Sequence, residues 1–402
     1  MAHSDQLTAV TSISHRPVLL DDILRPLWKC LRFSGLHHGF LPLSEEHRLV
    51  HILRRSLTVL ILVLVSGLGV FQLVQLVIVI TNRKSIADVS LNVVMSTACL
   101  MAIVFMHQLY ARHDQLVQFF RDWRQMETSF FNCRNRGRVT KVARVLNGIF
   151  FGLLVVFIPQ TTWFNLFVPL QSFWFSSIEN LREKLGLHFL VSLFTVSIYF
   201  TMLFLLLSQI VPTIFYYQAG CMIENLELEL QSCSTPVLNG HDSTPRNGNC
   251  YQLMWDRYES IQRLVCRANH LFGLIMATNQ FSLICMNCLQ IYVIITVKNV
   301  ISFIALLTAI LVFVAITVAT NCLVSHLNLS CGELKNSVAI LLNTKWSFLD
   351  QEERELLGFF FHRLDKDDLA ACPLNLYTID RTNLLGLLTL HISYIIVLLQ
   401  SK

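Results

Sequence analysis

Seven long, mostly apolar stretches constrain the fold of this chain more than any other feature. A helix needs about 20 apolar residues to cross the hydrocarbon core of a bilayer. The stretches are Leu57–Ile80, Asp88–Tyr110, Val142–Val168, Leu187–Tyr217, Leu271–Thr296, Ile301–His326 and Leu384–Gln400. Charged residues make up only 14% of the chain, against about 25% in soluble domains. We therefore predict an all-α polytopic membrane protein with seven transmembrane helices.

The distribution of Lys and Arg predicts the orientation of these helices. Loops that are rich in Lys and Arg stay on the cytoplasmic side of the membrane. Of the 31 Lys and Arg residues, 24 lie in the N-terminal segment and in the loops after the second, fourth and sixth stretches. We therefore predict a cytoplasmic N-terminus and an extracellular C-terminus, which is opposite to the orientation of G-protein-coupled receptors.

These assignments divide the chain into four parts. Residues 1–56 form a cytoplasmic N-terminal segment, 57–326 a six-helix bundle with its loops, 327–383 a cytoplasmic region, and 384–402 the last transmembrane helix. Within the bundle, 231–250 is rich in Ser, Thr, Pro, Gly and Asn, which predicts a flexible linker. Helical patterns with one apolar face flank this linker, so we expect a packed cytoplasmic layer of helices.

Motifs for catalysis and for cofactor binding are absent from the sequence. It contains no GxxxxGK, HExxH or GxSxG motif and no pair of carboxylates inside the stretches. We predict no enzyme activity, no catalytic residue, no cofactor and no metal site. Cys285 and Cys288 have CxxC spacing but no second pair or nearby His, so we interpret them as ordinary buried thiols.

Two further classes of feature are not expected. None of the 12 cysteines falls in a predicted external loop, which makes a disulfide framework improbable. The Lys and Arg residues form no continuous basic face with interleaved aromatic residues, which excludes a nucleic-acid partner. The membrane lipid and a ligand are then the partners to consider.

The last apolar stretch has one small, polar face. At 100° per residue, this stripe is formed by Gly386, Thr389, Ser393, Val397 and Gln400, and leucines and isoleucines cover the opposite side. The stripe has two interpretations. It is either a seam where membrane helices pack closely, with the glutamine bonding across it, or the wall of a pore, where the glutamine contacts hydrated ions and the valine forms an apolar constriction. The helical wheel alone does not decide between them.

The segment "DLAACPLNLYTIDRTNLLGLLTLHISYIIVLLQ", residues 368–400, resembles the C-terminal signature of the insect gustatory receptor family, a branch of the insect chemoreceptor superfamily. That signature has a Cys ahead of the last helix, then an Asp or Asn followed by a short apolar run. Cys372 and Asp380 stand in these positions. Weaker agreement is found at Tyr258, Asn269 and Phe272, ahead of the fifth stretch.

The signature ends in Thr-Tyr, five residues and Gln-Phe. Ser393 and Tyr394 fill the first pair, and Gln400 and Ser401 fill the second, with "IIVLL" keeping the spacing. Ser393 preserves the hydroxyl group of the usual Thr. Ser401 does not preserve the apolar bulk of the usual Phe.

The resemblance implies a tetrameric, ligand-gated, non-selective cation channel in the plasma membrane of sensory neurons. The last helix of each subunit would line the pore, and the tetramer would be a homotetramer or a heterotetramer with other gustatory receptors. Carried over by position, the pore constriction falls on Val397 and Ser401, with Gln400 between them and Ser393 on the same face. Because Ser401 is polar, we expect the closed gate to rest mainly on Val397. Tyr394 lies off the stripe, which favours a packing role.

A small-molecule tastant is the ligand that the resemblance implies, in the outer halves of the second to sixth helices. Aromatic walls with a few polar groups are typical of such pockets. The candidate ligand contacts are Gln160, Trp163, Phe164, Asn287, Gln290 and Tyr292. Aromatic belts at membrane interfaces offer a second explanation for the aromatic members of this set.

Two other functions stay open at this point. One is a seven-span receptor that signals through a cytoplasmic partner docked on the long internal loops. The other is an odorant receptor of the same superfamily, which the spacing of Tyr394 and Gln400 disfavours. The sequence does not distinguish a sugar, a bitter compound or an internal cue as the ligand.

Overall fold

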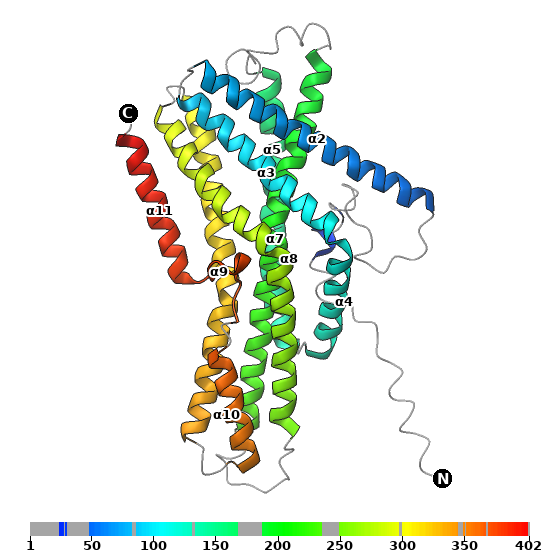
Figure 1. Cartoon of the computed structure of the whole chain (residues 1–402), viewed down its shortest axis with the longest axis vertical. Helices are drawn as coiled ribbons and strands as arrows, with labels where there is room; N and C mark the ends of the chain where they lie inside the picture. Colours follow the sequence, from blue (N-terminus) through cyan, green and yellow to red (C-terminus); the bar gives the residue numbers. More distant parts are fainter. Residues whose placement is uncertain are drawn as a thin grey trace.

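The protein is described by a computed structural model of the whole chain, drawn in Figure 1. The residues described are 24–27, 29, 48–82, 86–130, 133–167, 187–234, 249–296, 300–344, 349, 351–366 and 369–400. Apart from the short 3-10 helix η3 (Pro373–Asn375), every regular element in these ranges is an α-helix. They are α2 (Arg48–Thr81), α3 (Ile86–Ala111), α4 (His113–Phe130), α5 (Cys133–Phe167), α7 (Leu187–Ser234), α8 (Asn249–Thr296), α9 (Val300–Thr344), α10 (Gln351–Lys366) and α11 (Arg381–Gln400).

Each of the seven predicted stretches falls on one helix, from α2 and α3 through α5, α7, α8 and α9 to α11, except that Val168, the end of the third stretch, lies outside the described residues. Five helices, α2, α3, α7, α8 and α9, contain described segments long and apolar enough to cross a membrane. The other two predicted spans, in α5 and α11, include many side chains outside the described set. The sequence therefore located the apolar helices well.

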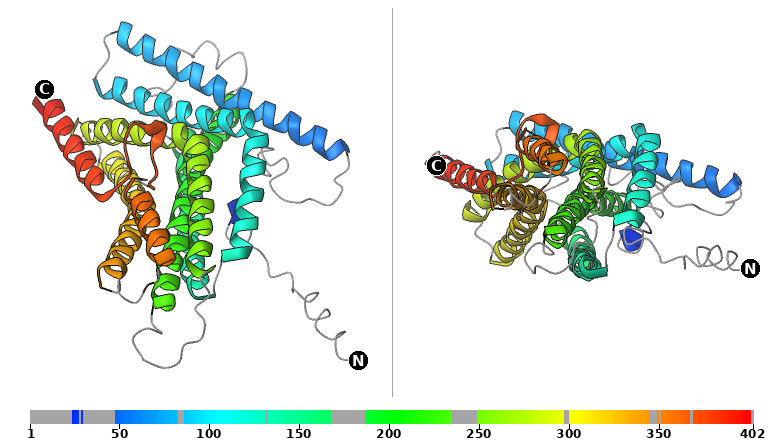
Figure 2. Two further views of the ribbon diagram at one scale, coloured as in Figure 1. Left: turned by 60° about the horizontal axis from the view of Figure 1, so that its bottom comes forward. Right: turned by 90° about the horizontal axis from the view of Figure 1, so that it is seen from below.

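Three helices are much longer than a membrane crossing requires. Helices α7 and α8 have 48 residues each and α9 has 45, which at 1.5 Å per residue is roughly 70 Å, against about 30 Å for the hydrocarbon core. Their lower parts project as a bundle against which α10 packs, and α4 lies beside α8 (Figure 1, Figure 2). The expected layer of packed helices is thus present, and its cytoplasmic location stays a prediction.

Parts of the predicted connecting regions are helical. In the region 327–383, α9 continues to Thr344 and α10 follows, neither of which the sequence predicted. The predicted linker 231–250 overlaps the last turn of α7 and the first residues of α8, and 235–248 lies outside the described residues. Packing against neighbouring helices stabilises these polar helical turns, which periodicity alone does not reveal.

A proline inside α7 explains one polar contact in the bundle. Pro212 has no N–H group, so the carbonyl of Ser208, four residues earlier, loses its helical hydrogen bond. The Nδ2 of Asn279 on α8 donates to this carbonyl at 3.0 Å, and the Ser208 hydroxyl donates to Asn279 Oδ1 at 3.1 Å. A buried asparagine therefore satisfies the group that the proline leaves unpaired, and it joins α7 to α8.

A second amide pair joins α8 to α9. The Nε2 of Gln280 donates to Asn321 Oδ1 at 2.7 Å, and Asn321 Nδ2 lies 3.4 Å from Gln280 Oε1. Polar side chains of this kind commonly hold membrane helices together, because apolar surfaces gain little from leaving lipid.

Helices α7 and α9 approach closely at Gly220. A Cβ atom there would lie 3.0 Å from Cδ2 of His326 and 3.1 Å from the backbone of Leu327. We therefore expect Gly220→Ala to lower the free energy of unfolding by about 1 to 3 kcal/mol, because the methyl group forces the helices apart. Gly332→Ala on the exposed face of α9 is the control, since nothing lies within 4 Å of its Cβ position. Thermal unfolding in detergent measures both, and an equal midpoint for the two variants would contradict this prediction.

The cysteines largely follow the sequence-based interpretation. Cys285 is half-buried, Cys288 is buried and neither forms a disulfide bond. Cys250, at the end of the predicted linker, forms a disulfide bond that the sequence did not predict.

Candidate functional site

The segment that leads into the last helix is tied to the bundle by one asparagine. We call residues 369–380 the anchor segment. The Oδ1 of Asn269 on α8 accepts hydrogen bonds from the Tyr216 hydroxyl on α7 at 2.7 Å and from the Cys372 backbone N–H at 3.0 Å. Its Nδ2 donates to the Ala370 carbonyl at 3.0 Å. One side chain therefore joins α7, α8 and the anchor segment.

The anchor segment packs directly on the backbone of α8. A Cβ atom at Gly273 would lie 3.0 Å from the backbone N of Leu374, so this glycine permits the approach. Leu374 and Asn375 have positive φ angles of 53° and 57°, which turns the chain sharply. The Ile379 N–H then donates to the Ala371 carbonyl at 2.9 Å and closes the segment into a loop.

Tyr377 is partly buried in the same segment. Burial raises the pKa of its phenol to about 12, because the charged form loses its hydration. The hydroxyl therefore stays neutral at physiological pH.

Asp380 begins the last helix. Its Oδ1 accepts a hydrogen bond from the Asn383 backbone N–H at 2.6 Å, three residues later, which is the geometry of a helix N-cap. The Asn383 side chain donates to the Thr378 carbonyl. The family-signature residues Cys372 and Asp380 thus position α11: one is fixed to Asn269 through its backbone and the other caps the helix.

Helix α11 lies at the edge of the bundle, where it contacts α8 and α9 (Figure 1, Figure 2). The small, polar stripe predicted on it is exposed at each of its positions, Gly386, Thr389, Ser393, Val397 and Gln400. Val397 is 60% exposed. Among the described residues, therefore, no other helix of the chain covers this stripe.

The stripe hydroxyls are satisfied within α11 itself. The Thr389 hydroxyl donates to the Leu385 carbonyl at 3.0 Å, and the Ser393 hydroxyl donates to the Thr389 carbonyl at 2.9 Å. Neither hydroxyl needs a partner on a second helix. Among the described residues, therefore, this stripe forms no packing seam with another helix of the chain.

Tyr394 and Ser401 are the two other predicted positions at the last helix. Tyr394 is 53% exposed, and the packing role expected for it stays a prediction. Ser401 lies outside the described residues. The structure therefore brings Ser393, Val397 and Gln400 onto one open face and leaves the gating role of Ser401 untested.

Of the six candidate ligand contacts, the structure describes the side chain of one. Asn287 on α8 is 1% exposed, and neither its Oδ1 nor its Nδ2 has a hydrogen-bond partner among the described residues. The other five lie in α5 and α8, and their side chains are outside the described set; they are Gln160, Trp163, Phe164, Gln290 and Tyr292. An unpaired buried amide costs about 1 to 3 kcal/mol, which makes Asn287 a candidate for contact with a bound molecule.

Two cavities lined by described residues lie between α4 and α8. One has a volume of about 360 Å³ beside Asp122 and Arg263, and the other, of about 450 Å³, lies beside Asp114 and His270. Both touch Arg267. They are open, charged clefts in the predicted cytoplasmic layer, away from the predicted ligand positions.

Sequence reasoning noted Asn269 only as a weak family agreement and missed Tyr216. The two residues are 53 positions apart and meet only because α7 and α8 cross at this depth. Tyr258 and Phe272, the other weak agreements, are both buried. Phe272 belongs to a cluster of rings that joins α4, α7 and α8, formed with Phe119, Phe120, Trp123 and Phe215.

Comparisons with known proteins agree with this architecture. The fold matches the structure of the insect olfactory receptor OR5 from Machilis hrabei with a TM-score of 0.75 and 16% sequence identity, over 95% of this chain and 99% of that one. The structure of the same receptor in complex with eugenol matches with a TM-score of 0.68 and 17% identity, over 96% and 99% of the two chains. A search of curated proteins found no sequence match.

The predicted all-α polytopic membrane fold is confirmed by these structural matches. The sequence profile of the family described as 7tm Chemosensory receptor matches residues 24–402, which is nearly the whole chain. The protein therefore belongs to the 7tm chemosensory receptor family, and it is a multi-pass membrane receptor rather than an enzyme.

Proposed function

We propose that this receptor is a ligand-gated, non-selective cation channel in which α11 of each of four chains lines a central pore. The observation that carries this proposal is the open stripe on α11, where Val397 and Gln400 are exposed in the single chain. A membrane helix gains little by presenting Ser, Thr and Gln to lipid, because polar groups in hydrocarbon cost free energy. Four such helices around an axis would instead turn the stripe toward water.

The pore interpretation also explains the internal bonding of the stripe. Hydroxyls that bond back to their own helix, as those of Thr389 and Ser393 do, leave the remaining lone pairs free to face water. The anchor segment fixes the start of α11 to α7 and α8 through Asn269. A shift of these helices on ligand binding would therefore be transmitted to the pore wall.

Current recordings test this function. We expect ligand-evoked cation currents when the chain is expressed, alone or with co-receptors, in cells that lack insect signalling proteins. The competing function, a receptor that signals through a cytoplasmic partner, predicts no current in such cells. Surface labelling of the same cells shows whether the receptor is present, so that a missing current is not caused by missing protein.

We assign the receptor to the gustatory branch and to the plasma membrane of sensory neurons. Support comes from the Tyr394-to-Gln400 spacing, which follows the gustatory signature. The olfactory branch is the second candidate, because the matched Machilis hrabei structures are of an olfactory receptor, one of them in complex with eugenol. A panel of sugars, bitter compounds and volatile odorants distinguishes the two branches.

Asn287 is the residue that we expect to contact the ligand. It lies in the predicted outer half of α8, is almost fully buried, and has an amide without a partner among the described residues. A bound small molecule with a hydrogen-bonding group would satisfy this amide and recover the cost of burying it.

We therefore expect Asn287→Leu to raise the half-maximal concentration of a hydrogen-bonding agonist about tenfold, which corresponds to ~1.4 kcal/mol. Stability should be unchanged or higher, since the substitution removes an unpaired buried amide. Asn279→Leu is the matched control, because that amide is paired with Ser208. The control should lower stability and leave agonist ranking unchanged. Concentration–response curves on surface-expressed receptors measure the shift, and an unchanged curve for Asn287→Leu would contradict the assignment.

A further inference from the structure

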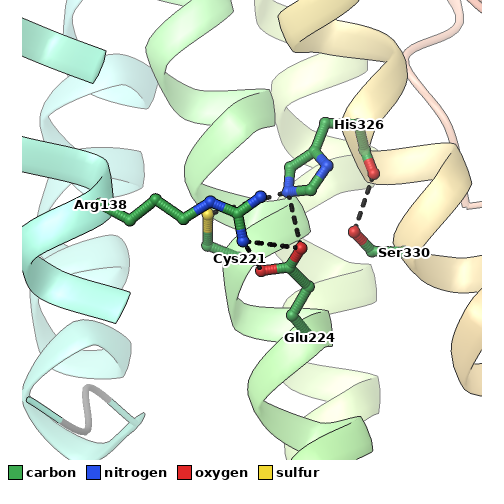
Figure 3. A network of polar contacts seen from close by, with 5 residues as sticks. All are labelled: Arg138, Cys221, Glu224, His326 and Ser330. Atoms are coloured by element: carbon green, nitrogen blue, oxygen red, sulfur yellow. Dashed lines mark hydrogen bonds and ion pairs between the residues drawn. The ribbon is translucent and has the colours of Figure 1, made fainter. Parts of the chain in front are cut away.

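Three side chains that bind transition metals meet between α7 and α9. Cys221 and Glu224 lie one turn apart on α7, and His326 on α9 faces them (Figure 3). Their donor atoms lie within 4.8 Å of one another. The close approach at Gly220 makes this possible, because a side chain there would collide with the His326 ring.

The donor separations are near those of a tetrahedral metal site. His326 Nε2 lies 3.2 Å from Glu224 Oε1 and 3.9 Å from Cys221 Sγ. With metal–ligand bonds of 2.0 to 2.3 Å, tetrahedral geometry places neighbouring donor atoms about 3.3 to 3.6 Å apart. No two donor atoms are more than 4.8 Å apart, so a closure of about 1 Å at most, by rotation of the flexible Glu224 side chain, brings them to tetrahedral spacing.

The three donor residues are largely buried, but two of their side chains remain partly exposed to solvent. The Cys221 residue is fully buried, and the side chains of His326 and Glu224 are 12% and 16% exposed. The Tyr217 ring packs against the His326 ring with centroids 5.0 Å apart, which limits the orientations of the imidazole. A metal ion could therefore reach the donors from one side and would find them already oriented.

Arg138 on α5 is a second charged partner of Glu224, besides His326. Its Nη1 contacts both carboxylate oxygens, at 3.0 and 3.2 Å. The Arg138 side chain is 55% exposed and can move into solvent, and each carboxylate oxygen has a further lone pair. The guanidinium thus hydrogen-bonds the carboxylate and orients it, as outer partners of metal ligands commonly do.

We propose that Cys221, Glu224 and His326 bind one Zn²⁺ ion, with water as the fourth ligand. A thiolate, an imidazole and a carboxylate suit Zn²⁺, whereas Mg²⁺ and Ca²⁺ favour sites made only of oxygen atoms. The Zn–S bond forms as the thiol releases its proton to water. The ion would join α7 to α9 at their predicted cytoplasmic edge. This proposal does not depend on the channel function.

Zinc titration of the purified full-length receptor tests the site. The receptor is kept reduced in detergent, and Zn²⁺ is added in competition with a chromophoric chelator. We expect one Zn²⁺ per chain, and we expect Cys221→Ser, Glu224→Gln and His326→Gln each to weaken binding by at least about tenfold. Cys331→Ser on α9 is the matched control, since this half-buried free thiol lies outside the cluster and should bind as the wild type does.

A spectroscopic measurement on the wild type avoids reliance on variants that fold poorly. Co²⁺ bound in place of Zn²⁺ should show a thiolate-to-cobalt charge-transfer absorption, and this band should be absent from Cys221→Ser and present in Cys331→Ser. Absence of the band from the wild type would overturn the proposal. So would zinc affinities that are equal in the wild type and in the three cluster variants.

Discussion

Replacing Val397 with alanine should raise the basal current of the surface-expressed channel about tenfold. In the proposed pore, four copies of this valine form an apolar constriction that excludes water when the channel is closed. The substitution removes two methyl groups per chain and so weakens the apolar constriction, and a net loss of about 1.4 kcal/mol from the closed state corresponds to a tenfold change. Val397→Asp should open the pore further, because a charge wets the constriction.

Ile392→Ala provides the control for the gate. Ile392 is a similarly exposed aliphatic residue on α11, 59% against 60% for Val397, but it lies on the opposite side of the helical wheel. Its truncation should leave the basal current unchanged. Whole-cell recordings, normalised to surface protein, measure these currents. Basal and evoked currents that are the same in Val397→Ala, Val397→Asp and the wild type would exclude Val397 as the gate.

Replacing Asn269 with alanine should lower the free energy of unfolding by about 3 kcal/mol. Three hydrogen bonds disappear at once, from the Tyr216 hydroxyl, from the Cys372 N–H and to the Ala370 carbonyl. Each is worth about 1 kcal/mol, and buried groups left unpaired add to the loss. The anchor segment would then be held less firmly, so evoked currents should fall even where folded receptor reaches the surface.

Two variants show whether this effect is specific. Tyr216→Phe removes one of the three bonds and should cost about 1 kcal/mol. Asn336→Ala replaces an exposed asparagine on α9 and should change stability by less than about 0.5 kcal/mol. Thermal unfolding in detergent ranks the variants. If Asn269→Ala unfolds at the same temperature as Asn336→Ala, the asparagine does not fix the anchor segment.

Hydrophobicity and charge are local properties of a segment and do not depend on distant neighbours. For this reason the sequence predicted the apolar helices. Each predicted stretch falls on a helix, and the last one, ending at Gln400, is correct to within three residues. The helical turns beyond the membrane were harder to predict. Thr344 ends α9 well past its apolar stretch, and α10 is polar overall, since both depend on neighbours that bury one face.

The polar stripe on α11 shows most clearly what the sequence determines and what the tertiary structure decides. The sequence by itself determined that Ser393, Val397 and Gln400 share one face, because helical spacing is a local property. Only the tertiary structure decided that this face is left open by the chain's other described helices. A wheel shows which residues point the same way, but it does not show what lies opposite them.

Contacts between distant residues were decided by the tertiary structure alone. Asn269 meets Cys372 across 103 positions, and Cys221 meets His326 across 105. The sequence shows which chemical groups are present: an amide that can donate and accept hydrogen bonds, and a thiol one helical turn before a carboxylate. Whether they meet depends on how far one helix slides and rotates against another, and that register is set by packing along the whole length of α7, α8 and α9 rather than by the residues that finally touch.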